Sequence, residues 1–173
     1  MTDKGNPWYV QFFKSDYLAT YRHVLSVAAT AQETAFVEQF LGLASGDTIL
    51  DLCCGIGRHS IPLAKHGFLV TGQDLNHEYL QQIQREANHG KVSVNVIEGD
   101  MRSIPFNNHF DAVINMFSSF GYLHSDTEEL RVLSAIKAAL RPGGKFLLDL
   151  LNREWVIRHY DQYDWREGDD GSL

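Results

Sequence analysis

The sequence predicts an α/β fold, a doubly wound and mostly parallel sheet of about five strands with helices on both faces. Three observations predict it. Short apolar runs alternate with helical patterns from residue 45 onward, a glycine-rich turn follows the first run, and capping residues precede later helical stretches. With 173 residues and 44% hydrophobic content, the chain suits one domain with a single core.

The N-terminal part, residues 1–44, is expected to be helical. Pro7 is typical of the first position of a helix, and the aromatic-rich residues 8–21 follow it. Three of these aromatic residues are four positions apart and predict one apolar helix face: Phe13, Tyr17 and Tyr21.

A second helix is expected to begin at Thr30, because Thr30 and Glu33 form a capping-box pattern. Glycine is the commonest residue after a helix end, so this helix should end near Gly42 or Gly46. The residues expected to point into the core are Phe36, Val37, Phe40 and Leu41.

The sheet is expected within residues 45–152, and residues 153–173 should form a C-terminal tail. The five expected strands span residues 48–53, 68–73, 92–97, 111–116 and 145–151. The helices between them are expected to end near Lys65, to be capped by Asn76, and to begin at a capping pattern of Asp126 and Glu129. In the tail, residues 152–160 are typical of a helix and residues 164–171 of a polar, unstructured segment.

Composition excludes several classes of function. The formal net charge of -7 disfavours a nucleic-acid backbone as the main partner. No apolar run could span a bilayer and no leader pattern opens the chain, so a cytoplasmic location is expected. The two cysteines, Cys53 and Cys54, exclude a disulfide framework. Adjacent strand residues point to opposite faces, so no metal site is expected.

The first strand leads into a candidate ligand-binding turn. Asp51 stands near the end of the strand, and Gly55 and Gly57 follow it before a helix. Glycines here permit positive φ and let a ligand approach the backbone, so Gly57→Val should abolish binding. A nicotinamide fingerprint would add a third small residue, for which Ser60 could serve. Alone, the motif fits an ordinary tight turn equally well.

Acids also end the next two strands. Asp74 could accept both ribose hydroxyls of an adenosine, or it could cap the next helix. Asp100 could accept the exocyclic amine of adenine while Met101 packs on the ring, or both could belong to a polar turn. After the fourth strand, an aromatic-rich loop could line a ligand site, or its residues Phe117, Phe120 and Tyr122 could attach the loop to the core.

In combination these motifs resemble the class I S-adenosylmethionine-dependent methyltransferases over residues 45–152. The family's first motif is acid-x-Gly-x-Gly-x-Gly, and here Cys53 replaces the first glycine. The resemblance implies that S-adenosylmethionine is the cofactor, with its methionine end at Asp51 and the glycine turn and its ribose at Asp74. It also implies a Rossmann-like sheet and an N-terminal lid helix. The cofactor-binding residues that it implies are Asp51, Cys53, Gly55, Gly57, Arg58, His59, Asp74, Leu75, Asp100, Met101 and Asn115, the last beside the sulfonium.

The C-terminal end departs from the family pattern. The family's sheet has seven strands, with a final antiparallel hairpin after the fifth, and this chain stops before that hairpin. Either the sequence is a truncated piece or the gene product is naturally short. Residues 145–151 would then have an unpaired edge, so a homodimer through this edge or the tail is expected.

The function expected from the resemblance is in-line methyl transfer to a small-molecule acceptor. No residue is assigned as catalytic, since no general base stands out and neutral amines need none. The aromatic residues expected near the reacting methyl group are Tyr9, Phe12, Phe117 and Phe120. One alternative is a cofactor-binding remnant or interaction module without turnover. A nicotinamide-dependent oxidoreductase would leave Asp51 and Asp100 unexplained.

Overall fold

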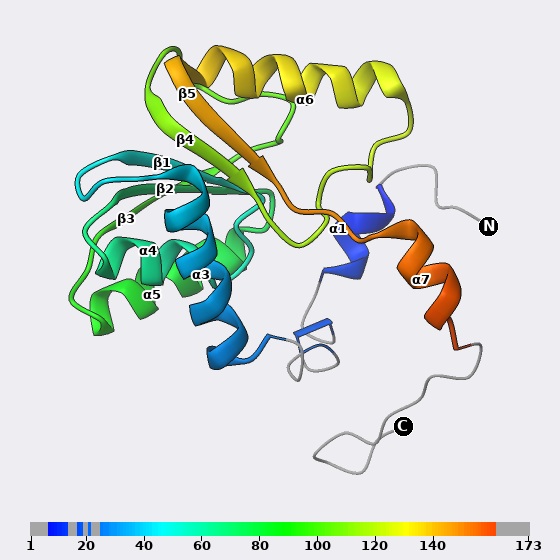
Figure 1. Cartoon of the computed structure of the whole chain (residues 1–173), viewed down its shortest axis with the longest axis horizontal. Helices are drawn as coiled ribbons and strands as arrows, with labels where there is room; N and C mark the ends of the chain where they lie inside the picture. Colours follow the sequence, from blue (N-terminus) through cyan, green and yellow to red (C-terminus); the bar gives the residue numbers. More distant parts are fainter. Residues whose placement is uncertain (1–6, 14–16, 19–20, 22–24, 162–173) are drawn as a thin grey trace.

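The computed structural model describes residues 7–13, 17–18, 21 and 25–161, so the predicted unstructured segment 164–171 lies outside the described residues. The strands are β1 (Thr48–Leu52), β2 (Leu69–Asp74), β3 (Val94–Glu98), β4 (Phe110–Asn115) and β5 (Leu140–Leu148). They form one sheet in the order β3-β2-β1-β4-β5, and every neighbouring pair is parallel. The predicted five-stranded, doubly wound sheet is confirmed (Figure 1).

Helices cover both faces of this sheet (Figure 1). The described helices are α1 (Trp8–Phe12), α3 (Val27–Leu41), α4 (Ser60–Lys65), α5 (His77–His89), α6 (Asp126–Ala139) and α7 (Arg153–His159), of which α3 to α6 cover the sheet. Buried residues of α3, α4 and α5 form one core cluster with one face of the sheet, and residues of α6 form a second cluster with the other. The inner strands β1, β2 and β4 are buried along most of their length, which explains their nearly continuous apolar runs.

The strand order fixes where a ligand can bind. From β1 the chain passes outward to β2 and β3, and it then returns to place β4 on the opposite side of β1. The sheet therefore has a switch point between β1 and β4. In open α/β sheets the crevice beyond the carboxyl ends of the strands at such a point is the usual ligand site.

The first helix is shorter than the sequence predicts. The α1 helix ends at Phe12, because Phe13 has a ψ of 61° and leaves the helical conformation. The expected ring contacts are nevertheless present, with centroids 4.7 Å apart for both Phe13–Tyr17 and Tyr17–Tyr21. The predicted single helix face through Phe13, Tyr17 and Tyr21 is therefore wrong, because Phe13 lies outside α1, although the three rings are close to one another.

The second helix begins earlier than predicted. Ser26 caps α3 by accepting a hydrogen bond from the Ala29 N–H at 3.2 Å, so the proposed capping box at Thr30 is wrong. The helix ends at Gly42 in the left-handed conformation, as expected. Its buried stripe is Thr34, Val37 and Leu41, spaced by three and four.

Two aromatic residues of α3 face outward, against expectation. Phe36 is 52% exposed and Phe40 is 67% exposed, and their rings stack 5.1 Å apart. The reason is geometric, because positions 36 and 40 lie off the stripe formed by Val37 and Leu41 on a 3.6-residue turn. The inward assignment of Val37 and Leu41 is confirmed.

Later elements agree with the prediction apart from their ends. Asn76 caps α5 as expected, but α6 is capped by Ser125, one residue before the predicted Asp126. The β5 strand starts at Leu140, because residues 141–144 form an irregularity in its pairing with β4. The α7 helix confirms the helical pattern that follows β5. In the described sheet β5 is an edge strand.

Candidate functional site

A cavity of about 810 Å³ opens at the carboxyl ends of the strands, where the topology places a ligand site. It lies between the sheet and the N-terminal segment. All of the predicted cofactor-binding residues line it except Gly57 and Asn115. Those that do are Asp51, Cys53, Gly55, Arg58, His59, Asp74, Leu75, Asp100 and Met101.

Asp51 lies at the floor of the cavity, near the end of β1. Its side chain is buried, and its Oδ2 accepts a hydrogen bond from the Ser60 hydroxyl at 2.5 Å. Burial raises the pKa of Asp51, while the neighbouring His59 and the Ser60 hydrogen bond act to lower it. Ser60 could have been the third small residue of a nicotinamide fingerprint. In the structure it instead holds the carboxylate of Asp51 by a hydrogen bond.

The turn after β1 has the left-handed conformations that glycine favours. Cys53, Gly55 and Gly57 have φ values of 60°, 55° and 79°. Cys53 occupies the position of the family's first glycine, and a non-glycine residue in this conformation costs about 1–2 kcal/mol. Its Sγ lies 3.6 Å from the Met101 Sδ, so the side chain joins this turn to the β3 loop.

Gly57 has a packing role and does not line the cavity. A Cβ built on it would lie 2.7 Å from Cγ1 of Ile83, a fully buried residue of α5. Gly55, by contrast, faces the cavity, and a Cβ there would meet nothing within 4 Å. The expected positive φ of Gly57 is confirmed, and the structure indicates that its substitution acts through helix packing.

Asp74 connects three parts of the site at the end of β2. Its Oδ2 accepts the Gly55 N–H at 2.9 Å, and its Oδ1 accepts the Asn76 N–H at 2.8 Å. The side-chain Nδ2 of Asn76 donates to the Phe13 carbonyl at 2.9 Å, and this bond ties the N-terminal segment to the sheet. Burial raises the pKa of Asp74, and these backbone hydrogen bonds oppose the rise.

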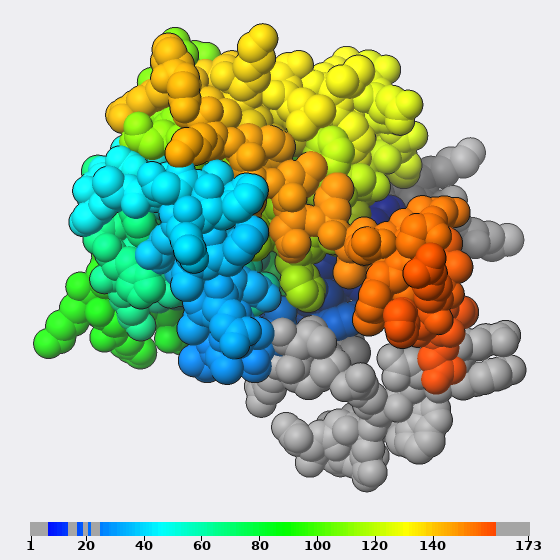
Figure 2. Space-filling model, in the orientation of Figure 1, coloured from blue at the N-terminus to red at the C-terminus, as the bar shows by residue number. Residues whose placement is uncertain are grey.

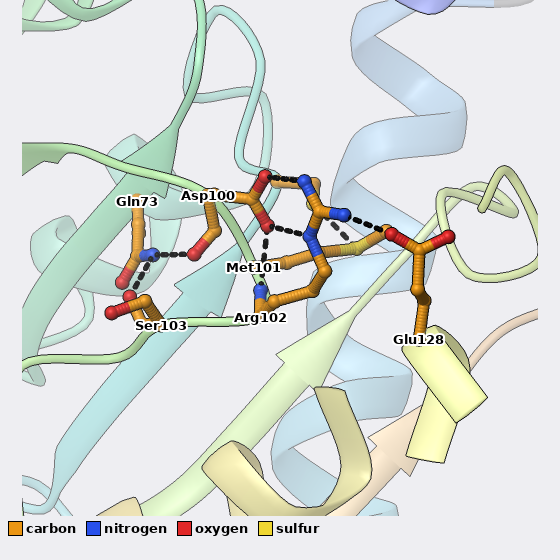
Figure 3. A network of polar contacts seen from close by, with 7 residues as sticks. Gln73, Asp100, Met101, Arg102, Ser103 and Glu128 are labelled. Carbon is orange, nitrogen blue, oxygen red and sulfur yellow. Dashed lines mark hydrogen bonds and ion pairs between the residues drawn. The ribbon is translucent and has the colours of Figure 1, made fainter. Parts of the chain in front are cut away.

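Asp100 follows β3 and is held by a residue that sequence reasoning missed. Arg102 donates to both carboxylate oxygens of Asp100 and also pairs with Glu128 of α6 (Figure 3). The hydrogen bond from the Arg102 side chain is the main cause that lowers the pKa of Asp100. Only the adjacency of Arg102 to Asp100 in the sequence could have indicated it.

Asn115 lies at the end of β4 but off the cavity wall. Its Nδ2 donates to the Leu52 carbonyl at 2.8 Å and so bridges β4 to β1. Its Oδ1 is buried and has no hydrogen-bond partner within the described part of the chain. Asn115 lies beside Cys53, and its contacts therefore support the floor of the site.

Glu33 of α3 is a second residue that the sequence did not reveal. Its Oε2 pairs with the Arg58 guanidinium and lies 2.8 Å from the His59 Nε2. Arg58 also lies over the Phe117 ring, 5.3 Å from its centroid. The residue that the sequence suggested as part of a helix cap thus fixes both basic side chains of the cofactor turn.

Aromatic side chains form the opposite wall. Tyr122, from the loop between β4 and α6, lies at its centre, with its ring centroid 4.9 Å from that of Trp8. The aromatic residues that line the cavity are Tyr9, Phe13, Tyr17, Tyr79, Phe117 and Tyr122. Of the predicted set, Tyr9 and Phe117 face the cavity, whereas Phe12 is 47% exposed and Phe120 packs against the core.

The loop that carries Phe117 is bound to the end of β5. Phe117 and Ser118 are both left-handed, with φ values of 64° and 61°. Asp149 holds them, because its Oδ2 accepts the Phe117 N–H at 2.9 Å and its carbonyl accepts the Ser118 N–H at 3.0 Å. Two residues in this conformation persist only where surrounding contacts fix them.

The charge of the cavity selects among adenosine-containing ligands. Asp51, Asp74 and Asp100 lie on it from three neighbouring strands, and the cationic side chain of Arg58 is already paired with Glu33. A pyrophosphate would be repelled by these carboxylates, which disfavours a dinucleotide. S-adenosylmethionine fits, because it carries a sulfonium, an ammonium group and no phosphate.

Two further results concern the described residues alone. They contain no group of three or more His, Cys, Asp or Glu side chains placed to hold a metal ion. None of their helices is both long and apolar enough to cross a membrane.

Comparisons with known proteins agree with this site. Residues 49–144 match a family model described as a methyltransferase domain. YqeM of Bacillus subtilis (strain 168), named as a methyltransferase, is 33% identical over 135 residues, which are 78% of this chain and 53% of that protein. A glycine/sarcosine N-methyltransferase of Halorhodospira halochloris is 29% identical over 75% of this chain and 49% of its own length.

Solved structures give the same result. CalS10, an amino pentose methyltransferase from Micromonospora echinaspora solved with S-adenosylmethionine bound, superposes with a TM-score of 0.68 at 27% identity, over 82% of this chain and 58% of its own. The chain thus spans about half the length of the curated relatives it matches. The sequence, the fold and the family model together show that the chain belongs to the class I S-adenosylmethionine-dependent methyltransferases.

Proposed function

We propose that this protein transfers a methyl group from S-adenosylmethionine to an amine nitrogen of a small-molecule acceptor. One observation carries the proposal, namely a single cavity that joins the carboxylates of Asp74 and Asp100 to an aromatic wall around Tyr122. The carboxylates suit the cofactor, and the wall suits an acceptor of modest size. The glycine/sarcosine enzyme and CalS10, whose names specify N-methylation and an amino pentose, support an amine as the acceptor.

The cofactor-binding roles follow the position of each side chain. Asp74 accepts the ribose hydroxyls, since each carboxylate oxygen can accept more hydrogen bonds than the one backbone N–H it now receives. Asp100 accepts the adenine amine, and Met101 packs on the ring. Asp51 and the turn at Gly55 hold the methionine end. When bound, the cofactor supplies an electrophilic methyl group on a cationic sulfur.

The aromatic wall serves the acceptor side. Rings such as Phe117 and Tyr122 exclude water, and the face of each ring attracts a cation by about 1 kcal/mol or more. Holding an amine in line with the methyl group accounts for most of the expected acceleration, since orientation is worth roughly 7–11 kcal/mol. A neutral amine needs no general base, and His59 on the cavity is already paired with Glu33.

The direct test is turnover. The protein should convert S-adenosylmethionine to S-adenosylhomocysteine in the presence of one or more members of a panel of small amines, and more slowly with thiols or carboxylates. Methylated product is identified by mass spectrometry. Binding of S-adenosylmethionine with no turnover on any acceptor would instead support a cofactor-binding module. Absence of binding would refute the proposal.

We also propose that the N-terminal segment, residues 1–44, acts as a lid on the cofactor. Tyr122 stacks against Tyr9 and Phe13 and makes an edge contact with Trp8, and aromatic pairs contribute about 0.5–1.5 kcal/mol each. Tyr122→Ala is therefore expected to raise the dissociation rate of S-adenosylhomocysteine by roughly tenfold or more. Stopped-flow displacement measures it. The control is Phe40→Ala, an exposed ring away from this cavity, and an equal effect of both would contradict a lid.

A second surface feature concerns the oligomeric state. The stacked pair Phe36 and Phe40 lines a second groove together with Leu148 and Leu150. Figure 2 shows the surface of α3 next to that of the end of β5. We propose a homodimer through this edge, in the cytoplasm and without nucleic acid. Light scattering at micromolar concentration should give about twice 19.6 kDa, and Phe40→Glu should reduce it to the monomer mass. A wild-type monomer would contradict the dimer and leave the enzyme assignment unchanged.

A further inference from the structure

The adenine-side carboxylate is clamped by a single arginine. Arg102 donates from Nε to Asp100 Oδ1 at 2.9 Å and from Nη2 to Oδ2 at 2.5 Å, and its backbone N–H donates to Oδ1 at 2.8 Å (Figure 3). Both oxygens are thus engaged by the planar fork of the guanidinium. A bidentate pair of this kind fixes orientation as well as charge.

The clamp is itself anchored on both sides. Nη1 of Arg102 pairs with Glu128, in the first turn of α6, so the guanidinium cannot rotate away from Asp100 without losing that partner. Beneath the loop, the fully buried Gln73 donates from Nε2 to the carbonyls of Asp100 at 3.0 Å and Ser103 at 3.1 Å. Backbone and side chain are therefore held by separate contacts.

This division separates two roles. Gln73 fixes where the loop lies, and Arg102 fixes where the carboxylate of Asp100 points. Asp100 lines the cavity. Its Oδ1 accepts two hydrogen bonds from Arg102 and its Oδ2 accepts one, so Oδ2 retains the capacity to accept a ligand donor. An ionised carboxylate can only accept, so it favours a donor such as a 6-amino group and repels a 6-oxo group.

We propose that Arg102 is a positioning residue that holds Asp100 as a fixed acceptor, and that it thereby sets the preference of this site for a 6-amino purine over a 6-oxo purine. The inference rests on the proposed binding of S-adenosylmethionine. Arg102 also lowers the pKa of Asp100, which keeps the acceptor form to lower pH. The other titratable groups around it are Glu128 of α6, Tyr9 of α1 and Cys53.

The experiment compares two probes by calorimetry, S-adenosylhomocysteine and S-inosylhomocysteine. Wild type should prefer the adenine compound by about a hundredfold, since one charge-assisted hydrogen bond is gained and one repulsion avoided. Arg102→Met should reduce this preference to less than about tenfold while the affinity for the inosine compound changes little. Arg102→Lys, which keeps the charge without the fork, should restore part of it.

A pH series adds a readout that a purely structural role would not move. In Arg102→Met the pKa of Asp100 should rise, because burial then acts without the arginine. As the pH is lowered, the preference for the adenine compound should therefore disappear at a higher pH in the variant than in wild type. Arg141→Met is the matched control, because it removes an arginine paired with Asp111 at the other end of the sheet. It should leave both affinities unchanged.

The outcomes separate the hypotheses. A parallel loss of both affinities in Arg102→Met, with an unchanged ratio, would mean that Arg102 only stabilises the loop, and it would overturn the inference. Equal binding of both probes by wild type would also overturn it, while the methyltransferase assignment stood. Failure of wild type to bind S-adenosylhomocysteine would instead reject the proposed function, and this inference with it.

Discussion

Gly57→Ala is expected to destabilise the protein by roughly 2–5 kcal/mol, a large part of the ~5–15 kcal/mol typical of a folded domain. Two costs add. A non-glycine residue at a φ of 79° costs about 1–2 kcal/mol, and forcing a methyl group against a packed core costs about 1–3 kcal/mol. The methyl would lie 2.7 Å from Cγ1 of Ile83. Urea denaturation followed by circular dichroism measures the loss.

Gly143→Ala is the matched control for this experiment. Its φ of 82° is nearly the same, but a Cβ there meets nothing within 4 Å. It should therefore show only the backbone cost of about 1–2 kcal/mol. Equal destabilisation by both substitutions would show that contact with Ile83 contributes nothing, and a Gly57→Ala protein of wild-type stability would contradict the packing role altogether.

Asp74→Ala is expected to weaken binding of S-adenosylhomocysteine by roughly tenfold to a hundredfold, since unpaired ribose hydroxyls cost about 1–3 kcal/mol. The same change frees the Gly55 and Asn76 N–H groups, so part of the loss could come from a disturbed turn. Asp74→Asn separates the two effects, because it keeps an acceptor oxygen and the side-chain shape. Calorimetry gives the affinities, and thermal unfolding shows whether the turn survives.

The pH dependence gives a further check on Asp74. Burial raises its pKa, so the folded protein loses the ionised acceptor at a higher pH than an exposed aspartate would. Affinity for S-adenosylhomocysteine should therefore fall as the pH is lowered through that raised pKa. Wild-type affinity in Asp74→Ala, or a loss equal to that of Asp111→Ala at the opposite end of the sheet, would contradict the ribose assignment.

The parts of the fold that the sequence predicts are those that depend on local pattern. Apolar runs gave the strands, and topology alone brings the carboxyl ends of β1, β2 and β3 together, so Asp51, Asp74 and Asp100 could be predicted as neighbours. The ends of elements were less certain. Residues 141–144 obscured the start of β5, and apolar residues on two sides of α3 left the burial of Phe36 ambiguous.

The missed residues share a physical reason. Glu33 pairs with Arg58 across 25 positions of the chain, and Arg102 pairs with Glu128 across 26. Neither pairing has a local pattern, because each depends on how a helix docks against a loop of the sheet. Charged residues on helices are usually solvated, so nothing in the sequence distinguishes these from the rest.

The hydrogen bonds from Phe117 and Ser118 to Asp149 hold the loop of the aromatic wall in an unfavourable backbone conformation next to the end of β5. Each left-handed residue costs about 1–2 kcal/mol, and the two hydrogen bonds from the loop to Asp149 offset that cost. If a chain paired along the β5 edge and shifted Asp149, it would also change how firmly this loop is held. By thermodynamic reciprocity, an acceptor that favours the held loop would in turn strengthen that pairing. Edge and cavity are in this sense one linked equilibrium.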